Sequence, residues 1–376
     1  MTQIFLIRHG EAEGNLYRRA QGQTDSPLTA KGREQAASLA PRFAEVPLDA
    51  AYASDLCRAR DTALAAVGDR DVPVVIEPRL REMGFGAWEN RPWGEINRED
   101  MDLKTWFLTD PEKWHVPGSE DFAVMQGRIY AAMENIARRH EGGAVLVVCH
   151  GVAIRAFLAR VRGVASADIL SVRLPDNASV TALRWEDGAF SIEYVNDTSH
   201  LPEPPYVPFR ETNLDKSGVS YDLRYTPFDT KTGKELYLRC YRDAWRTAHG
   251  SLRGFDENAC WRGAVLRAAD SPAALTAAWR DEDFAGILAL DERRGAGRGI
   301  GWIAFLYIVP ELRRHRCGIQ LIGTAAARYR ELGRKCLRLT VAPSNPALGF
   351  YQWAGFTRVD TEPGALEPLL VMEKPL

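Results

Sequence analysis

The sequence predicts an α/β protein of two domains, and three observations carry this prediction. The chain has 376 residues, which is enough for two domains of ordinary size. Four prolines between residues 200 and 218 exclude a continuous helix or a central strand there. Strands and helices follow a different order before and after this stretch. We therefore expect a first domain at 1–200, a proline-rich linker at 201–219 and a second domain at 220–376.

Apolar strands and helices alternate before the prolines. The expected elements are a strand at 4–7, a helix at 30–45 with Thr29 as its N-cap, a strand at 50–54 leading into a helix from Asp55, a helix at 119–140, a strand at 145–149, a helix at 153–161 and a hairpin at 179–195. Strands that are apolar on both faces and separated by helices indicate a mainly parallel sheet covered on both sides. The first domain is therefore expected to be a three-layer α/β/α domain.

The second half reads differently, because most of its strands are not separated by helices. The expected elements are a helix at 234–249, two strands around a charged turn within 275–290, a strand at 302–310, a helix at 319–332, a strand at 337–341, a short helix within 345–356 and a strand at 369–374. This order predicts an α+β domain with a mostly antiparallel sheet.

Composition narrows the class of function. The chain is 45% hydrophobic and 26% charged, with a formal net charge of −2, which argues against wholesale binding of nucleic acid or membrane surfaces. No apolar run is long enough to span a bilayer, and the N-terminus lacks the features of a signal peptide. The six cysteines contain no C-x-x-C pair. We expect free thiols, no metal site and a cytoplasmic protein.

Two apolar strands run directly into His-Gly, at IFLIRHG (4–10) and VLVVCHG (145–151). Ligands of open α/β sheets lie beyond the carboxyl ends of the strands. If the two strands are sheet neighbours, His9 and His150 meet at that edge, with Arg8 beside them. A single histidine in this position is most often structural, but two such junctions in one domain favour a site.

Further residues join this pair in a fixed order. The pattern runs through Arg8-His9-Gly10-Glu11, Asn15, Gln21-Gly22, Asp25, Pro27-Leu28-Thr29, Gly32, Ser54-Asp55-Leu56, Arg58-Ala59, Thr62-Ala63, Glu82, Phe85-Gly86, Trp88-Glu89 and His150-Gly151. It resembles the histidine phosphatase (phosphoglycerate mutase-like) superfamily over about residues 1–200. One departure is Ala12, where the family often has threonine. The resemblance implies a phosphoglycerate mutase-like fold and phosphoryl transfer through a phosphohistidine.

Chemistry supports the roles that this resemblance implies. Neutral imidazole is a good nucleophile toward phosphorus, so His9 can take the phosphoryl group. Arg8 and Arg58 offer permanently charged guanidinium groups that can donate two hydrogen bonds each to the phosphoryl oxygens. Protonated His150 and the side chain of Asn15 can complete the pocket, and the resemblance adds Gln21 and Gly22 to the residues that bind phosphate.

Glu82 is the candidate acid for the leaving oxygen, and then the base for the water that cleaves phosphohistidine. This task needs a carboxyl group with a raised pKa, which the nearby apolar Phe85 and Trp88 can promote. Taken singly, Arg58 could be a solvated helix residue and Glu82 a surface carboxylate. Taken together with the histidines, they favour a phosphatase-type site.

The reaction is expected to be hydrolysis of a small-molecule phosphate ester without a metal. A mutase is the alternative, because it uses the same intermediate but must exclude water. The segment 80–96, LREMGFGAWENRPWGEI, resembles the phosphatase branch of the superfamily, including α-ribazole phosphatase-like members. Four tryptophans, at 88, 93, 106 and 114, either line a lid over an organic leaving group or pack in the core.

Two stretches of the second half resemble motifs of GNAT-type N-acetyltransferases. The first, YIVPELRRHRCG (307–318), joins a strand to a helix N-terminus that can bind an anion. The second is SNPALGFYQWAGF (344–356). The resemblance implies acetyl-CoA as cofactor and an amine as acceptor. It assigns the cofactor contacts to Ile308, Val309, Arg313, Arg314, His315, Arg316, Cys317, Gly318, Asn345 and Tyr351.

Arg316 departs from the family pattern, which has glycine there. Glycine lets the backbone approach the pyrophosphate and tolerates unusual backbone angles. Arg316 can either crowd the pyrophosphate-binding loop or add a positive charge near the phosphates. The alternative for the whole basic run is a solvated patch or a nucleic-acid contact.

An active GNAT-type domain uses Tyr351 to protonate the departing thiolate, as the resemblance implies. A phenol, with an unperturbed pKa of about 10, suits this task, although Tyr351 can also be a plain core aromatic. The second domain is therefore either an acetyltransferase or a non-catalytic acetyl-CoA-binding module that regulates the phosphatase. The sequence defines neither the substrates nor the oligomeric state.

Overall fold

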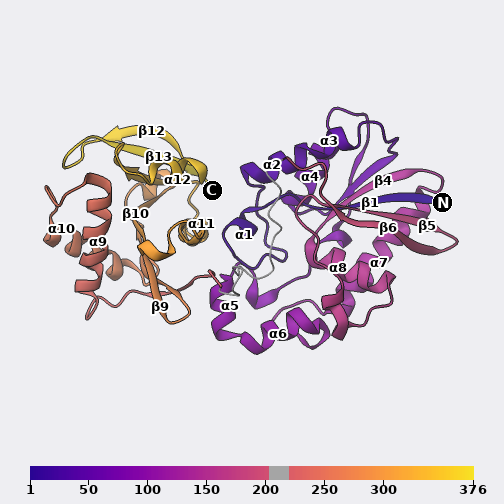
Figure 1. The fold of residues 1–376 in the computed structure, drawn as a ribbon, viewed down its shortest axis with the longest axis horizontal. Coiled ribbons are helices and arrows are strands. Elements are labelled where there is room, and N and C mark those ends of the chain that lie inside the picture. Colours follow the sequence, from indigo (N-terminus) through magenta and orange to yellow (C-terminus); the bar gives the residue numbers. More distant parts are fainter. Residues whose placement is uncertain (203–219) are drawn as a thin grey trace. The chain divides into compact units, whose positions relative to one another are not determined.

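The computed structural model describes residues 1–202 and 220–376. The chain forms two compact units, one of Met1–Arg91 with Glu99–Thr212 and the other of Pro92–Arg98 with Asn213–Leu376. Figure 1 shows the first unit in indigo to magenta and most of the second in orange to yellow. Beyond its first two residues, the linker expected at 201–219 lies outside the described residues.

A six-stranded sheet with the order β3-β2-β4-β1-β5-β6 forms the centre of the first unit. Its strands are β1 (Thr2–Arg8), β2 (Ala50–Ala53), β3 (Val74–Ile76), β4 (Ala144–Cys149), β5 (Val180–Glu186) and β6 (Ala189–Asp197). The strands from β3 to β1 are parallel, and β5 and β6 are antiparallel. The predicted mainly parallel sheet is confirmed.

Helices cover both faces of this sheet (Figure 1). Leu39 and Phe43 pack with Ala59 and Ala63 of α4 against Leu146 and Val148 of β4, which is one face. Helices α7 and α8 contact β1 and each other on the other face. The helices of this half of the chain are α1 (Glu13–Leu16), α2 (Ala30–Ala37), α3 (Leu39–Arg42), α4 (Cys57–Val67), α5 (Trp93–Glu99), α6 (Met101–Thr109), α7 (Phe122–Arg139) and α8 (Gly151–Val161).

The helix expected at 30–45 is wrong as one element, because it divides into α2 and α3 at Ser38. Pro41 has no N–H to bond the carbonyl of Ala37, and its ring crowds that carbonyl, so the helix cannot continue unchanged. Thr29 caps α2 as expected, since its hydroxyl accepts a hydrogen bond from the Gly32 N–H at 2.9 Å.

The second unit is built on a seven-stranded sheet with the order β12-β13-β11-β10-β9-β8-β7. Its strands are β7 (Arg224–Pro227), β8 (Leu275–Arg280), β9 (Asp283–Asp291), β10 (Ile300–Ile308), β11 (Cys336–Val341), β12 (Thr357–Glu362) and β13 (Leu369–Pro375). All neighbours pair antiparallel except β10 and β11. The mostly antiparallel sheet is confirmed.

Among residues 220–376 the structure has four α-helices: α9 (Lys234–His249), α10 (Glu257–Asp270), α11 (Cys317–Glu331) and α12 (Leu348–Trp353). Tyr237 and Leu238 of α9 and Ala264 of α10 pack against Ile287 and Ala289 of β9. Helix α11 packs against β10 and β11. The strands β7 and β12 and helix α10 were not expected from the sequence.

Strands β10 and β11 pair over only three residues, from Ile300 and Cys336 to Trp302 and Arg338. Beyond Ile303 a bulge shifts the register of β10 against β9. The pairing with β11 therefore stops before β10 reaches Tyr307 and Ile308, close to the loop that enters α11. Among the described residues, no helix combines the length and apolar character needed to cross a bilayer.

Candidate functional site

The two histidines meet at the carboxyl edge of the first sheet. Register pairs Arg8 of β1 with Cys149 of β4, so His9 and His150 each follow the last paired residue. The backbone N–H of His9 donates to the Cys149 carbonyl at 3.0 Å. The ring centroids of His9 and His150 lie 5.2 Å apart, and both side chains are buried. Parallel pairing therefore brings together residues that are far apart in the sequence.

One hydrogen bond fixes the reactive nitrogen of His9. Its Nδ1 lies 2.7 Å from the Gly10 carbonyl oxygen, which can only accept, so Nδ1 carries the proton. The lone pair then lies on Nε2. Burial lowers the pKa of His9 well below its ordinary value of 6.5, and the charges of Arg58 and Arg8 lower it further. The ring is therefore neutral and can act as a nucleophile.

His150 is buried, yet neither of its ring nitrogens has a hydrogen-bond partner among the described residues. A buried polar group without a partner costs about 1–3 kcal/mol, so these nitrogens are candidates for contact with a polar ligand. Burial, followed by the charge of Arg58, holds the pKa of His150 well below 6.5. Without a ligand His150 is thus neutral, and the protonated form expected from the sequence requires a bound anion.

Two arginines supply the positive charge of this site. Arg58, near the start of α4, is fully buried and donates to the carbonyls of Thr24 (2.9 Å) and Gly22 (2.7 Å). Its Nε has no partner among the described residues, and burial lowers its pKa to about 10. Arg8, also buried, donates from Nη1 to the Pro175 carbonyl at 2.6 Å. Both guanidinium groups are thus oriented by backbone carbonyls.

The carboxylate of Glu82 is buried against the first turn of α8. Its Oε1 accepts from the N–H groups of Met83 (3.0 Å) and Ala153 (2.9 Å), and its Oε2 accepts from Val152 (3.0 Å). Burial raises the pKa of Glu82, although these N–H groups and Arg58 oppose the shift. Because Oε2 accepts only one of the three hydrogen bonds, it has room to carry a proton.

The other residues expected to bind phosphate have partners within the same loops. Oδ1 of Asn15 accepts from the Ala12 N–H at 3.0 Å. Gln21 hydrogen-bonds the Ser26 hydroxyl, and Gly22 presents its carbonyl to Arg58. Their roles toward phosphate stay predictions.

Asn177 was missed by the sequence reasoning. Its Nδ2 donates to the His9 carbonyl at 3.1 Å and lies 3.4 Å from Oδ1 of Asn15. Asn177 precedes the antiparallel strand β5, so the rule for parallel strand ends does not single it out.

In the second unit, the basic loop turns sharply into α11. Arg316 is the N-cap of α11 and adopts a left-handed conformation, with φ 60° and ψ 17°. That conformation favours glycine by about 1–2 kcal/mol, so the backbone has the shape that the family glycine would give. His315 stacks on Tyr221 with ring centroids 4.4 Å apart, and Cys317 is buried. The N–H groups that open α11 have no partners within the helix, so this turn offers donors of the kind that a pyrophosphate needs.

The end of the strand before this loop, at Ile308 and Val309, is less suited to contact the cofactor. The Ile308 carbonyl accepts from Nε of Arg313 at 3.1 Å, and the Val309 N–H donates to the Ala285 carbonyl at 3.0 Å. Nη2 of Arg313 also pairs with Asp243 at 2.5 Å. Both backbone groups expected to hold the cofactor are therefore already bonded, and Arg313 is turned toward Asp243.

The remaining residues of this second candidate site lie around α12. Burial raises the pKa of Tyr351 to about 12, which keeps its phenol protonated. The side chain of Asn345 accepts from the Ala347 N–H at 2.8 Å and so stabilises the turn into α12. Gly318 lies against Phe350, whose Cζ is 3.2 Å from the position of an added Cβ. The two GNAT-like stretches, 307–318 and 344–356, are thus adjacent at Gly318 and Phe350.

A family model described as the histidine phosphatase superfamily (branch 1) matches residues 4–198. The chain belongs to this superfamily. A second model, the acetyltransferase (GNAT) family, matches residues 231–356. A histidine phosphatase domain and a GNAT domain therefore occur in one chain.

Two relatives illustrate the similarity of the histidine phosphatase domain. The "Probable phosphoglycerate mutase GpmB" of Enterobacter sp. (strain 638) is 31% identical over 209 residues, which are 54% of this chain and 97% of that protein. A solved structure titled "Bacillus stearothermophilus YhfR" has 36% sequence identity and a TM-score of 0.52, and the match covers 54% of this chain and 100% of that one.

Two of the four tryptophans expected either in a lid or in the core of the histidine phosphatase domain are core residues. Trp88 and Trp114 are fully buried, with ring centroids 5.2 Å apart. Nε1 of Trp88 donates to Asp100 at 2.9 Å. Trp106 is exposed, and the ammonium of Lys113 lies 4.8 Å from the centre of its ring.

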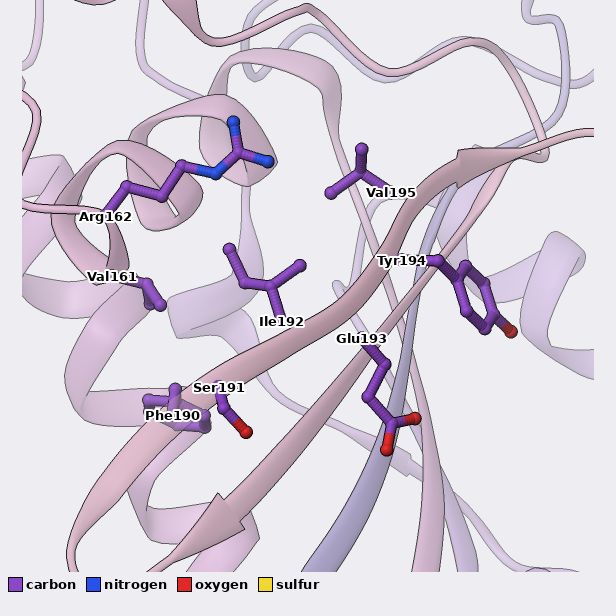
Figure 2. A pocket seen from close by; sticks show the side chains of 8 residues that line it. All are labelled: Val161, Arg162, Phe190, Ser191, Ile192, Glu193, Tyr194 and Val195. Atoms are coloured by element: carbon purple, nitrogen blue, oxygen red, sulfur yellow. The ribbon is translucent and has the colours of Figure 1, made fainter.

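The hollow in Figure 2 is separate from the histidine phosphatase site. It is lined by Val161, Arg162, Phe190, Ser191, Ile192, Glu193, Tyr194 and Val195, from the end of α8 and from β6. Helix α8 has 11 residues, so about 15 Å separates this end from His150. Within the described residues, no group of three or more His, Cys, Asp or Glu is placed to hold a metal ion.

Proposed function

We propose that the histidine phosphatase domain hydrolyses a small-molecule phosphate ester through a phosphohistidine at His9. The observation that carries this proposal is the buried His150 beside the neutral ring of His9. In the part of the chain that the structure describes, the ring nitrogens of His150 have no hydrogen-bond partner. Arg8 and Arg58 bring two positive charges to the same pocket. Together these groups form a buried, positively charged site next to a nucleophile.

In the first step, the Nε2 lone pair of His9 forms a bond to phosphorus as the bond to the ester oxygen breaks. Protonated Glu82 donates its proton from Oε2 to the departing oxygen, which leaves as an alcohol. The arginines and His150 stabilise the charge on the phosphoryl oxygens. Each well-placed donor of this kind contributes on the order of 3 kcal/mol to the transition state.

In the second step, a water attacks phosphorus and gives a proton to the Glu82 carboxylate. The bond between phosphorus and Nε2 breaks, and inorganic phosphate leaves. A carboxyl group with a raised pKa suits both steps, because it holds a proton in the first and accepts one in the second.

Phosphoglycerate mutase-type transfer is the alternative. It is supported by the name of one relative, "Probable phosphoglycerate mutase GpmB". Analysis of the products separates the two reactions. With 3-phosphoglycerate and a panel of metabolite phosphates, hydrolysis releases inorganic phosphate. Isomerised substrate without release of phosphate would contradict the proposal.

For the GNAT domain we propose N-acetyl transfer from acetyl-CoA to an amine. When bound, acetyl-CoA supplies the acetyl group. The amine nitrogen would bond to the acetyl carbon as the carbon–sulfur bond breaks, and the amine would release a proton to solvent. Tyr351, kept protonated by burial, would give its proton to the departing thiolate. The first turn of α11 and the Arg313–Gly318 loop, with Arg314, bind the pyrophosphate.

A non-catalytic acetyl-CoA-binding domain remains the second candidate, favoured by the bonded state of Ile308 and Val309. Calorimetric titration of acetyl-CoA into the whole protein and into Arg316→Gly tests whether the loop binds at all. Micromolar binding followed by acetylation of an amine supports the transferase. Binding with no turnover in an amine screen supports the regulatory module.

A further inference from the structure

We propose that Arg128, anchored by Glu120, is a positioning residue that sets the place of Glu82 in the phosphatase site. Among the described residues, Arg128 has no hydrogen bond or ring contact with either histidine, and its hydrogen bonds reach the segment that carries Glu82. The charge of Arg128 also contributes to lowering the pKa of His150, an effect that does not depend on the leaving group. The proposal rests on the acid role of Glu82 proposed above.

Arg128 lies on α7 and binds the backbone on which Glu82 sits. Its Nη1 donates to the carbonyls of Arg79 (2.8 Å) and Arg81 (2.7 Å), and its Nη2 donates to the Glu82 carbonyl (2.9 Å). One guanidinium group thus holds three carbonyls within four consecutive residues. A lysine has no planar fork with which to do this.

Glu120 fixes the guanidinium group in turn. Its Oε1 accepts from Nε of Arg128 at 2.6 Å, and its Oε2 accepts from Nη2 at 2.7 Å. Glu120 also bonds the far side of the same segment, because its Oε2 accepts from the Gly84 N–H at 3.1 Å and its own N–H donates to the Gly84 carbonyl at 2.9 Å. The pair therefore holds the chain on both sides of Glu82.

The segment needs such support because little regular structure holds it. After β3 it contains only a short 3-10 turn, Pro78–Leu80, before the isolated bridge of Phe85 with Ser119. Its buried carbonyls must find partners outside the local backbone. The side chains of Arg128 and Glu120 are mostly buried, at 19% and 17% exposure, so solvent screens this ion pair less than it would a surface pair.

The position of Glu82 matters because an acid must reach the leaving oxygen within hydrogen-bond distance. A misplacement of about 1 Å can cost roughly 100-fold in rate, whereas loss of the acid costs about 100- to 10,000-fold. Removing Arg128 should therefore reduce, but not abolish, acid catalysis. The loss should be largest for esters whose leaving group needs a proton.

The experiment compares Arg128→Met with Arg138→Met in the full chain. Arg138 lies on the same helix and pairs with Glu134 at 2.7 Å, but its side chain is 61% exposed. Rates are measured with aryl phosphates of graded leaving-group pKa and with an alkyl phosphate. Glu120→Gln is the second variant, because it removes the negative charge and one acceptor oxygen of the anchor while leaving in the chain the carbonyls to which Arg128 donates.

For Arg128→Met we expect kcat/KM, which reports the first step, to fall about 10- to 100-fold on the alkyl phosphate, with a much smaller fall on p-nitrophenyl phosphate. Arg138→Met should match the wild type, and Glu120→Gln should show a weaker form of the Arg128→Met pattern. Equal losses on all esters, or rates like those of the Arg138→Met control, would overturn the proposal. If Arg128→Met does not fold, Glu120→Gln decides by the same criterion. A wild type inactive on every ester would instead overturn the proposed function.

Discussion

The backbone nitrogen of Val152 donates a hydrogen bond to Oε2 of Glu82 at 3.0 Å. Val152 lies two residues after His150, in the first turn of α8. Helix α8 therefore contacts both residues: His150 is its N-cap, and Glu82, from a separate segment of the sequence, accepts hydrogen bonds from its first turn. Because α8 begins where β4 ends, the same turn that positions His150 also positions the carboxylate of Glu82.

Glu82→Gln should separate the proton-transfer role from phosphate binding. The amide keeps the size of the side chain but cannot donate an acidic proton. We expect kcat/KM, which reports the first step, to fall by about 100- to 10,000-fold on alkyl phosphates and far less on p-nitrophenyl phosphate. The check is a plot of log kcat/KM against leaving-group pKa. A uniform fall across the series would argue against the acid role.

The two active-site histidines should stay neutral well below pH 6.5. Burial and the nearby arginines lower the pKa of each. Their rings take up protons when the chain unfolds below pH 6.5, so the folded state loses stability as pH falls through this range. NMR of histidine-labelled protein, with His9→Gln and His150→Gln for assignment, should show no titration of either ring between pH 7.5 and 6.5. A midpoint at or above 6.5 for either ring would contradict the account.

Gly32→Ala should destabilise the phosphatase domain. An added Cβ would lie 1.9 Å from the backbone oxygen of Glu11, in the loop that follows His9. Backbone must shift to make room, which costs about 1–3 kcal/mol or more. Gly127→Ala is the matched control, because nothing lies within 4 Å of its Cβ position on α7, and alanine there should stabilise by about 0.5–1 kcal/mol. Thermal inactivation of the phosphatase activity measures both.

Asp243→Asn should strengthen binding of acetyl-CoA. Arg313 pairs with Asp243 at 2.5 Å while also donating to the Ile308 carbonyl. Weakening a partly exposed pair of this kind is worth about 0.2–1 kcal/mol, so a gain in affinity of roughly 1.4-fold to fivefold is expected. Tyr307→Phe is the control, since it removes a 2.9 Å hydrogen bond to Asp243 but leaves Arg313 in place. Unchanged or weaker binding by Asp243→Asn would contradict a role for this contact.

The fold could be predicted where apolar strands end in polar residues. The strands leading to His9 and His150 are buried on both faces, and their parallel pairing follows from that pattern. The predicted hairpin about Asp187 and Gly188 is present as β5 and β6, because both turn residues accept positive φ. Local pattern was sufficient for these elements.

Other elements gave no such pattern. Helix α10 buries little apart from Ala264 and exposes Val265 and Leu266, so no apolar face marks it. Strand β12 is mostly exposed and is held by its pairing with β13. These elements depend on contacts that only the folded chain supplies.

The same division holds for the site. His9, His150, Arg8, Arg58 and Glu82 follow from motif order, and the structure places all five at or beside the carboxyl ends of the parallel strands. Asn177, Glu120 and Arg128 act through backbone carbonyls and N–H groups of distant segments. Residue type and spacing in the sequence do not predict such contacts.

The most direct test of the central claim is to trap the phosphoryl group on the protein. The Glu82→Gln variant is mixed with p-nitrophenyl phosphate, quenched under alkaline conditions that preserve phosphohistidine, and mapped by mass spectrometry. The account predicts phosphate on the peptide that contains His9, and neither phosphate nor turnover in His9→Ala. Wild-type turnover in His9→Ala, or phosphate on another residue, would contradict the assignment of His9 as nucleophile.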